Sequence, residues 1–481
     1  MEYARNISSE STRQIAERIS KIANYPARSF YAQIDRDEVL ADLAKLVAYP
    51  SCSFEGFDIK PSLACAQAVA GMVKASGFTQ VELIDVGGRA PLVWAQHKAD
   101  IARYPQAPTL MLYAHYDIQP APVKEQGWRT DPFVLTLGED GRYYGRGSCD
   151  DKAGIVGHLH AIKTAGGLES LGHVNINICF EGEEECFGTL EEFVEQNPER
   201  FKADGYLVFD LGGIEPGQPA LTTTLRGTAM VDIEVRAIEH ELHSGAYGGP
   251  TPDALKGLLM TLASLWDEKG DTAIEGVESF EWTGAPYPEE LLRRDIGLVP
   301  GADLMGTGPV IDQLVSRPAA NIIGLDVPSV ASSSNVIIPC AKARVSVRFP
   351  YGQRVREVLD STIAHLRKHA PHGIALDFPF NSGASAFETD TDGLLVTAFA
   401  KTLTEVFGVE TTRLGSGGSI PLLAVLQQIS PRADFLLYGV SDMAKSNMHG
   451  GNESVDPDDL ERTIEAEAVF LQKLQDLDAL S

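Results

Sequence analysis

One stretch of the chain reads Leu110-Met111-Leu112-Tyr113-Ala114-His115-Tyr116-Asp117. It is a short apolar run followed at once by a histidine and an acid, which is typical of a buried strand whose end carries reactive groups. Two further apolar runs have the same form, because 174–180 leads into a run of acids and 207–209 leads into Asp210. Helix-like segments separate the three runs, so the sequence predicts an α/β fold with a mostly parallel sheet.

The pattern changes near residue 225, where longer alternating segments replace the regular succession of strand and helix signals. This change indicates a separate α+β unit, and the α/β pattern resumes after residue 383. We therefore expect a catalytic domain in two parts, 1–224 and 383–481, around an inserted domain at 225–382. The periodicity predicts further helices at 15–22, 38–48, 253–268 and 394–407, and strands at 228–237, 341–349 and 435–438.

Composition and charge exclude several classes of function. The 481 residues carry a formal charge of −27, which is the wrong sign for binding nucleic acid or an anionic membrane surface. Apolar runs break within about seven residues, far short of the roughly 18 that a membrane span needs. The first 25 residues lack the apolar core of a secretory signal, and the six cysteines form no CxxC pair. These features favour a cytoplasmic protein that acts on a small molecule.

His115 and Asp117 lie two residues apart in an extended segment, so their side chains point the same way. A carboxylate on one imidazole nitrogen fixes the tautomer and leaves the other nitrogen to bind a metal ion. The alternative is a structural histidine that is hydrogen-bonded to its neighbour.

Two acidic segments add candidate ligands. The glycine-rich run that begins at Gly145 delivers Asp150 and Asp151 to the start of a helix, where an Asp N-cap with a solvent-facing neighbour is the alternative. Glu184 and Glu185 belong to a run of acids after a buried strand. Such carboxylates repel one another on a solvated loop unless a cation neutralises them, and one can then bind the metal while its neighbour acts as general base.

The candidate set contains two imidazoles and three carboxylates, all at strand ends of one α/β pattern, with a spare glutamate beside the glutamate of the set. Its members are His115, Asp150, Glu185, Asp210 and His449. This donor set fits a pair of divalent ions such as Zn²⁺ or Mn²⁺ in a site that activates water.

These motifs, in this order, resemble those of the M20 metallopeptidases and, within them, dinuclear dipeptidases of the cytosolic non-specific dipeptidase and carnosinase type. The resemblance runs from about residue 37 to near the C-terminus. The motifs are His115-Tyr116-Asp117, Gly145-Arg146-Gly147-Ser148-Cys149-Asp150-Asp151-Lys152, Glu181-Gly182-Glu183-Glu184-Glu185, His243-Ser244-Gly245-Ala246-Tyr247-Gly248-Gly249, Gly417-Gly418-Ser419-Ile420-Pro421 and His449.

The resemblance implies two divalent ions in each subunit, zinc in the first place, with manganese or cobalt as alternatives. It assigns the ligands as follows: His115, Asp150 and Asp210 to one ion, and Asp150, Glu185 and His449 to the other, with Asp150 as the bridge. It also implies that Glu184 is the general base for a water that bridges the ions, and that Asp117 orients His115. A cis peptide between Asp150 and Asp151 is a further feature of the family.

In the same family the inserted unit is a lid and dimerisation domain. The resemblance therefore implies a homodimer in which His243 acts in trans, in the active site of the partner subunit. Arg348 matches the arginine that binds the C-terminal carboxylate of the substrate, and Gly417, Gly418 and Ser419 match a loop at the same end. An arginine on an exposed sheet face and a glycine-rich surface loop are the alternatives.

The expected activity is hydrolysis of the amide bond in a dipeptide or similar small substrate with a free C-terminal carboxylate. Deacylation of an N-acyl amino acid is the alternative within the family, since it uses the same catalytic residues and differs only in the pocket for the N-terminal side. A non-catalytic protein that kept the fold is a third hypothesis. The presence of Glu184 and of all five candidate ligands argues against it.

Overall fold

The computed structural model describes residues 34–186, 188–371 and 374–476. The chain divides into two compact units. The first unit takes in the described residues up to Thr223, then Thr389–Leu414, and those from Val425 onward, while the second comprises Thr224–Glu388 and Gly415–Ala424. The second unit therefore includes the expected inserted segment, 225–382, and also a short segment from near the C-terminal end. The helix expected at 15–22 lies outside the described residues.

The first unit is built on a sheet with the strand order β1-β2-β6-β3-β7-β18-β9. Its central strands β6, β3, β7 and β18 run parallel, whereas β1, β2 and β9 pair antiparallel with their neighbours. The bounds are β1 (Val81–Ile84), β2 (Leu92–His97), β3 (Thr109–His115), β6 (Asn175–Glu181), β7 (Gly205–Val208), β9 (Ala220–Leu225) and β18 (Asp434–Leu437). The α/β class and the three strands expected at 110–114, 174–180 and 207–209 are confirmed.

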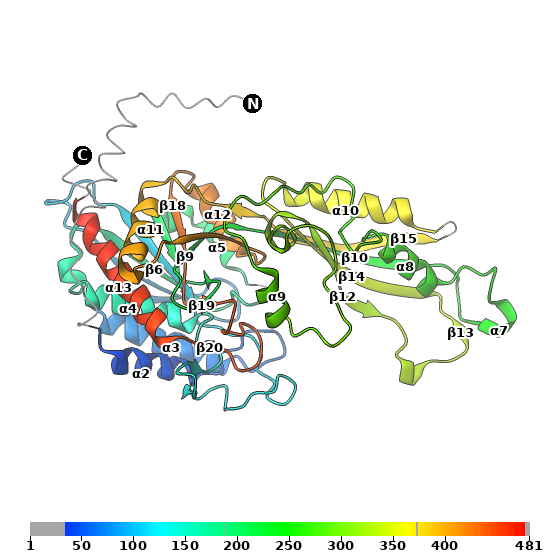
Figure 1. The fold of residues 1–481 in the computed structure, drawn as a ribbon, viewed down its shortest axis with the longest axis horizontal. Coiled ribbons are helices and arrows are strands. Elements are labelled where there is room, and N and C mark those ends of the chain that lie inside the picture. Colours follow the sequence, from blue (N-terminus) through cyan, green and yellow to red (C-terminus); the bar gives the residue numbers. More distant parts are fainter. Residues whose placement is uncertain (1–33, 187, 372–373, 477–481) are drawn as a thin grey trace, which may run out of the picture. The chain divides into compact units, whose positions relative to one another are not determined.

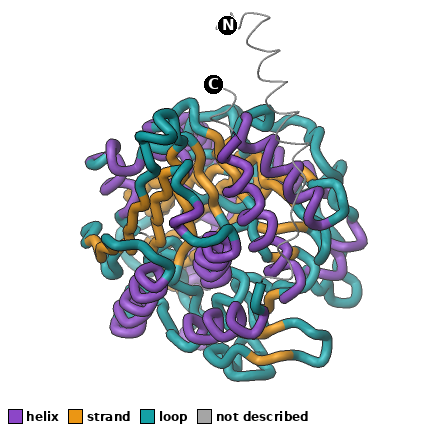
Figure 2. Tube along the Cα trace, turned by 90° about the vertical axis from the view of Figure 1, so that its left-hand side faces the viewer, coloured by secondary structure: helices purple, strands orange, loops and turns teal. Residues whose placement is uncertain are grey.

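Helices pack on this sheet because its central strands are apolar on both faces. In the first unit, α3 packs on β1 and β2, α4 on β3 and α11 on β18. Helix α13 lies against α4 and α11 (Figure 1). Figure 2, which colours helices and strands separately, shows helices lying over strands. The bounds are α2 (Arg36–Val47), α3 (Lys60–Ala75), α4 (Lys152–Thr164), α5 (Leu190–Gln196), α6 (Pro198–Phe201), α11 (Leu394–Phe407) and α13 (Pro457–Lys473). None of the helices in the described part of the chain has the length and apolarity that crossing a bilayer requires.

Short strands complete the first unit at the edge that carries the motifs. Strands β4 (Thr136–Leu137), β5 (Tyr143–Tyr144) and β20 (Ser454–Val455) form one small sheet, and β8 (Gly212–Gly213) pairs with β19 (Ser441–Asp442). Because β3, β6 and β7 are parallel, their carboxyl ends meet at one edge of the main sheet. That edge brings residues from five distant segments together.

The second unit is an α+β structure on an antiparallel sheet with the order β12-β14-β10-β15. Helices α8 and α10 pack on this sheet. The bounds are β10 (Gly227–Arg236), β12 (Ala319–Asp326), β14 (Cys340–Phe349), β15 (Ala375–Ala384), α8 (Ala254–Ala263) and α10 (Val355–His369). Smaller elements are β11 (Leu242–His243), β13 (Val336–Ile337), β16 (Phe387–Glu388), α7 (Ser244–Tyr247), α9 (Glu289–Asp295) and a π-helical turn at Asp312–Ser316. Two elements, β17 (Thr412–Ser416) and α12 (Pro421–Ile429), each have residues in both units.

Helix α8 is shorter than the 253–268 segment that the periodicity predicted. Its start is as expected, because the Asp253 side chain accepts hydrogen bonds from the backbone of Leu255 and Lys256. Its end differs because Trp266 forms an isolated β-bridge with Thr272 and donates from its indole N–H to the carbonyl of Ala320. These non-local partners stop the helix, although the apolar spacing continues.

Candidate metal centre

The structure brings all five candidate ligands to the motif edge of the first unit. His115 is the last residue of β3, Asp210 follows β7, Glu185 follows β6, and Asp150 precedes α4 by two residues. His449 lies in the loop between β19 and β20. Their ligand atoms form two groups, His115 with Asp150 and Asp210, and Asp150 with Glu185 and His449. Within each group these atoms lie within 4.8 Å of one another.

Asp150 is common to both groups, and its two oxygens face different imidazoles. The Nε2 atom of His115 lies 3.0 Å from Asp150 Oδ1 and 3.5 Å from Asp210 Oδ1. On the other side, Nε2 of His449 lies 2.9 Å from Asp150 Oδ2 and 3.2 Å from Glu185 Oε2. A carboxylate shared in this way can bridge two cations. The arrangement therefore fits a pair of ions.

Asp117 contacts two of these segments, the end of β3 and the turn after β6. The backbone carbonyl of Asp117 lies 3.1 Å from Nδ1 of His115, the nitrogen that faces away from the ligand groups, and the Asp117 carboxylate lies 3.4 Å from the same atom. The same carboxylate accepts hydrogen bonds from the backbone N–H of Glu184 and of Glu185, each at 3.1 Å. Asp117 thus contacts both the imidazole of His115 and the turn after β6.

The start of α4 places Asp150 beside its neighbour. The Asp150–Asp151 peptide bond is cis. The Asp151 side chain accepts a hydrogen bond from the backbone of Gly154 and caps α4, and it also accepts one from the backbone N–H of His115 at 3.2 Å. Asp151 therefore connects the helix start to the end of β3.

Burial and charge together favour cations in this cluster. Burial raises the pKa of Asp210 to about 6 and also raises that of Glu185, because carboxylates crowd together in a desolvated space. Burial opposes a charged His449, yet the carboxylates of Asp150 and Glu185 raise its pKa to about 11. The nitrogen and oxygen donors and the negative field suit divalent ions of the zinc type, so the residues fit the expected pair of metals.

Glu184 lies beside these ligands but belongs to neither group. Burial, followed by the charge of Asp210, raises the pKa of its carboxyl well above the usual range. Among the described residues, no hydrogen bond or ion pair engages the Glu184 side chain. A carboxylate with a raised pKa and no competing partner can accept a proton and later return it.

Arg348 and the 417–419 loop lie in the second unit. The Nη1 atom of Arg348, on β14, donates to Ser419 Oγ at 2.8 Å, and Ser419 Oγ in turn lies 3.1 Å from Thr228 Oγ1. A side chain at Gly417 would collide with the guanidinium of Arg226, which donates to the Gly417 carbonyl. No carboxylate pairs with Arg348 or with Arg226 in the described part of the chain.

His243 is an exposed residue of the second unit, on β11 opposite Val336. Its Nδ1 accepts hydrogen bonds from the backbone of Gly245 at 3.1 Å and of Ala246 at 3.2 Å. Because Nδ1 is an acceptor in this geometry, we infer that the ring proton sits on Nε2. His243 thus presents a hydrogen-bond donor to the outside of its loop.

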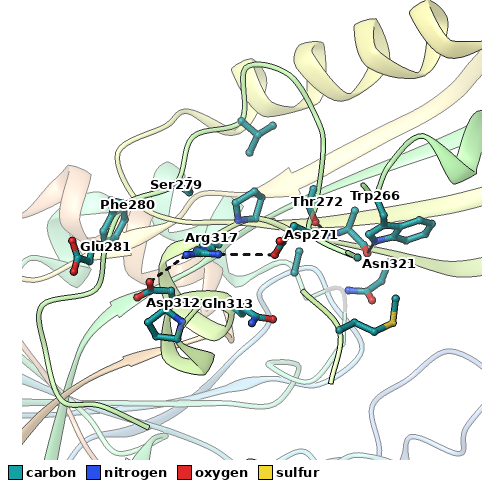
Figure 3. Close-up of a pocket in the computed structure, with 17 residues that line it drawn as sticks. Trp266, Asp271, Thr272, Ser279, Phe280, Glu281, Asp312, Gln313, Arg317 and Asn321 are labelled. Carbon is teal, nitrogen blue, oxygen red and sulfur yellow. Dashed lines mark hydrogen bonds and ion pairs between the residues drawn. The ribbon is translucent and has the colours of Figure 1, made fainter. Parts of the chain in front are cut away.

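A cavity of about 1070 Å³ also lies in the second unit (Figure 3). Figure 3 shows Arg317 between two acids, 3.5 Å from Asp312 and 3.9 Å from Asp271. The Asp271 carboxylate also accepts hydrogen bonds from Thr307. Neither of the two groups of possible metal ligands found among the described residues lies in this cavity.

Three further residues at these sites escaped the sequence analysis. Gln119 donates to Oε2 of Glu185 at 2.7 Å, and Glu453 accepts a hydrogen bond from the backbone of Asp150 at 3.2 Å. Arg226 is buried next to Arg348. Gln119 follows Asp117 by two residues, and Glu453 follows His449 by four. Their closeness in sequence to a motif was the signal that could have identified them. Nothing in the sequence pattern distinguished Arg226.

Several known proteins are similar to this chain in sequence or in fold. A sequence profile of peptidase family M20/M25/M40 matches residues 111–473. A cysteinylglycine-S-conjugate dipeptidase of Corynebacterium striatum is 39% identical over 76% of this chain and 81% of its own length. A beta-Ala-His dipeptidase of Rattus norvegicus is 25% identical over 88% of this chain and 90% of its own. The solved structure of the dipeptidase Dug1p from Saccharomyces cerevisiae has the same fold, with a TM-score of 0.75 at 21% identity and coverage of 98% and 99% of the two chains.

Proposed function

The chain belongs to peptidase family M20/M25/M40, and we propose from its site that it is a two-metal dipeptidase. Its substrates are dipeptides and similar small molecules with a free C-terminal carboxylate. The observation that carries the proposal is the carboxylate of Asp150, which is shared between two groups that each add a histidine and an acid. The dipeptidase names of the relatives described above support the choice of substrate.

Five side chains would hold the metals. One ion would take His115, Asp150 and Asp210, and the other Asp150, Glu185 and His449. Zinc suits this mixture of imidazole and carboxylate, and manganese or cobalt can replace it. When bound, the two ions supply Lewis acidity that lowers the pKa of water and polarises a carbonyl group.

Glu184 carries the proton through the reaction. Its carboxylate takes a proton from the attacking water as the water oxygen forms a bond to the carbonyl carbon of the substrate. The same proton then passes from Glu184 to the amide nitrogen, and the carbon–nitrogen bond breaks. An amine and a carboxylic acid form, and the acid loses the second proton of the water to the amine or to solvent as the products leave. The hydrogen bonds from the Glu184 and Glu185 backbone to Asp117 keep the base in place during both transfers.

Arg348 and the 417–419 loop bind the C-terminal carboxylate of the substrate. Burial, and then the charge of Arg348, lowers the pKa of Arg226 to about 10, so two cations lie near each other without an acid. Such a pair favours an anionic group of the substrate, and a guanidinium can bind a carboxylate through two hydrogen bonds.

Arg348→Ala should weaken binding of substrates with a free C-terminal carboxylate by about 2–5 kcal/mol, the cost typical of breaking a buried charge pair. The loss should appear as a raised KM, and it should be much smaller for C-terminally amidated analogues. Arg344→Ala is the matched control, because Arg344 lies on the same strand but pairs with Asp232 at 2.6 Å. Equal losses on free and amidated substrates would assign Arg348 a structural role.

The enzyme acts as a homodimer in which each active site uses His243 from the other chain. The exposed position of His243 and the donor that we infer at Nε2 support this role, because a donor there can stabilise an oxyanion. In a twofold dimer the exchange is reciprocal.

Two inactive variants, His243→Ala and Glu184→Gln, should therefore complement each other when they are unfolded together and refolded. A His243→Ala chain keeps its own Glu184 and receives the partner's His243. Random mixing should restore about a quarter of wild-type activity, since half of the chains enter mixed dimers and each such dimer has one working site. If mixed dimers form, as tagging can verify, and no activity returns, then His243 acts in the active site of its own chain or has no catalytic role.

A substrate panel tests the proposed function. Zinc-loaded protein should hydrolyse dipeptides such as Cys-Gly, S-substituted Cys-Gly and β-Ala-His faster than N-acetyl amino acids, with ninhydrin or mass spectrometry to detect the products. The opposite order would favour the deacylase alternative.

We place the enzyme in the cytoplasm, a location that its six free cysteines support.

A further inference from the structure

A buried ion pair joins the two segments that carry Asp150 and His449. Arg146 and Glu453 are almost fully buried, with 1% and 0% of their surfaces exposed, and Nη1 of Arg146 lies 2.7 Å from Oε2 of Glu453. The reaction described above uses neither side chain. Burying two charges costs free energy, so the further contacts that this pair makes are informative.

Glu453 organises the turn that presents Asp150. Its Oε2 accepts a hydrogen bond from the backbone N–H of Gly147 at 2.9 Å, and its Oε1 accepts from those of Cys149 and Asp150 at 3.0 Å and 3.2 Å. Gly147 has a φ of 81°, a left-handed conformation that turns the chain around this carboxylate. One side chain therefore fixes three of the four backbone positions up to Asp150.

Arg146 holds the loop that carries His449. Its Nη2 donates to the carbonyl of Gly450 at 2.9 Å, directly after His449, and its guanidinium lies 5.5 Å from the ring centre of Trp128. The backbone of Glu453 accepts a hydrogen bond from Gly145 at 2.9 Å, and strand β20 that follows pairs with β5. The segment that leads to Asp150 and the loop that carries His449 are thus connected through both backbone and side chains.

The His449 loop needs such support because its backbone is strained. Asn447, His449 and Asn452 have φ values of 49°, 61° and 60°, in the left-handed region that residues other than glycine rarely adopt. Conformations of this kind persist where the surrounding structure holds them. Here Asn452 Oδ1 accepts a hydrogen bond from the backbone of Arg129 at 2.8 Å, and Arg146 holds Gly450.

We propose that Glu453 and Arg146 are positioning residues that set Asp150 and His449 at the spacing the second metal requires. They act through the backbone of the ligand segments, as their hydrogen bonds show. The proposal rests on the proposed function, because it takes Asp150, Glu185 and His449 as ligands of one ion. It concerns that ion more than the other, because Asp150 and His449 are both ligands of the second ion, whereas the first ion shares only Asp150 with them.

Glu453→Gln tests the proposal. A glutamine offers one acceptor oxygen and one amide that donates, so it cannot accept from Arg146 and from all three backbone groups. We expect the affinity for the second ion to fall by about 10- to 100-fold, the range typical of lost partners behind metal ligands. Titration of chelated protein with Co²⁺, followed by visible absorption, should show one tight and one weakened binding event, where the wild type shows two tight ones.

Glu467→Gln is the matched control. Glu467 is also a fully buried glutamate of the first unit, and its carboxylate bonds to Nδ1 of His158 and the hydroxyl of Tyr438, each at 2.8 Å. This variant should keep wild-type affinity for both ions. The thermal unfolding midpoint of each variant in the presence of chelator reports any general loss of stability, which is separate from metal binding.

Arg146→Lys provides a second variant in case Glu453→Gln fails to fold. Lysine keeps the charge but cannot contact Glu453 and the Gly450 carbonyl in the same two-pronged way, so we expect a smaller loss in the same direction. Unchanged affinity for both ions in either folded variant would overturn the proposal. A wild-type chain that binds fewer than two ions in the same titration would instead overturn the proposed function.

Discussion

Glu184→Gln should lower kcat by about 100- to 10,000-fold, the usual contribution of a general base, while the protein keeps both metal ions. The glutamine amide has nearly the same shape but cannot take a proton from the attacking water. Metal content should stay normal because Glu184 belongs to neither ligand group and its backbone N–H still bonds to Asp117. Steady-state kinetics together with metal analysis of the same preparation make the measurement.

Glu185→Gln is the paired variant, one residue along the same turn. The Glu185 carboxylate lies 3.2 Å from His449 and belongs to the group with Asp150 and His449. This substitution should therefore cause loss of one ion before it affects proton transfer. If Glu184→Gln lost the ion and Glu185→Gln kept it, the assignment of base and ligand along this run would be wrong by one residue.

Removal of metal should abolish activity, and added Zn²⁺, Mn²⁺ or Co²⁺ should restore it. The physical reason is the crowding of carboxylates around His115 and His449, because burial of these charges is favourable only beside cations. Chelation should also lower the thermal unfolding midpoint, since ligands that bind the native state stabilise it. Dialysis against chelator, metal analysis and a dipeptide assay before and after repletion test this expectation.

Glu184→Gln serves as the control for that experiment. Its unfolding midpoint should fall on chelation as much as that of the wild type, although it has little activity to lose. This result would separate the binding of metal from the chemistry. Full activity in a preparation that metal analysis shows to be free of ions would contradict the two-metal mechanism.

Local sequence patterns predicted the parts of the site that depend on strand ends. The apolar run before His115 and the alternating run before the acids at 181–185 became β3 and β6, and their parallel pairing brings the two ends together. The prediction of an inserted unit rested on the same kind of signal, because the alternating periodicity of the segments that became β10 and β14 differs from that of the parallel strands. Such features depend on short-range spacing, which the sequence displays directly.

Long-range contacts were the part that local patterns could not predict. Glu453 meets the backbone of Gly147 and Asp150 across about 300 positions of sequence, and no spacing rule connects them. Helix α8 ends early because Trp266 finds partners on β12 and near Thr272. The segment at 415–424 belongs to the second unit through its contacts, although the chain around it belongs to the first.

Anomalous diffraction from crystals of the zinc-loaded enzyme tests the central claim most directly. We expect two zinc peaks in each chain, one on either side of the Asp150 carboxylate. His115 and Asp210 should complete the first site, and Glu185 and His449 the second. A single peak, or peaks that do not share Asp150, would contradict that claim.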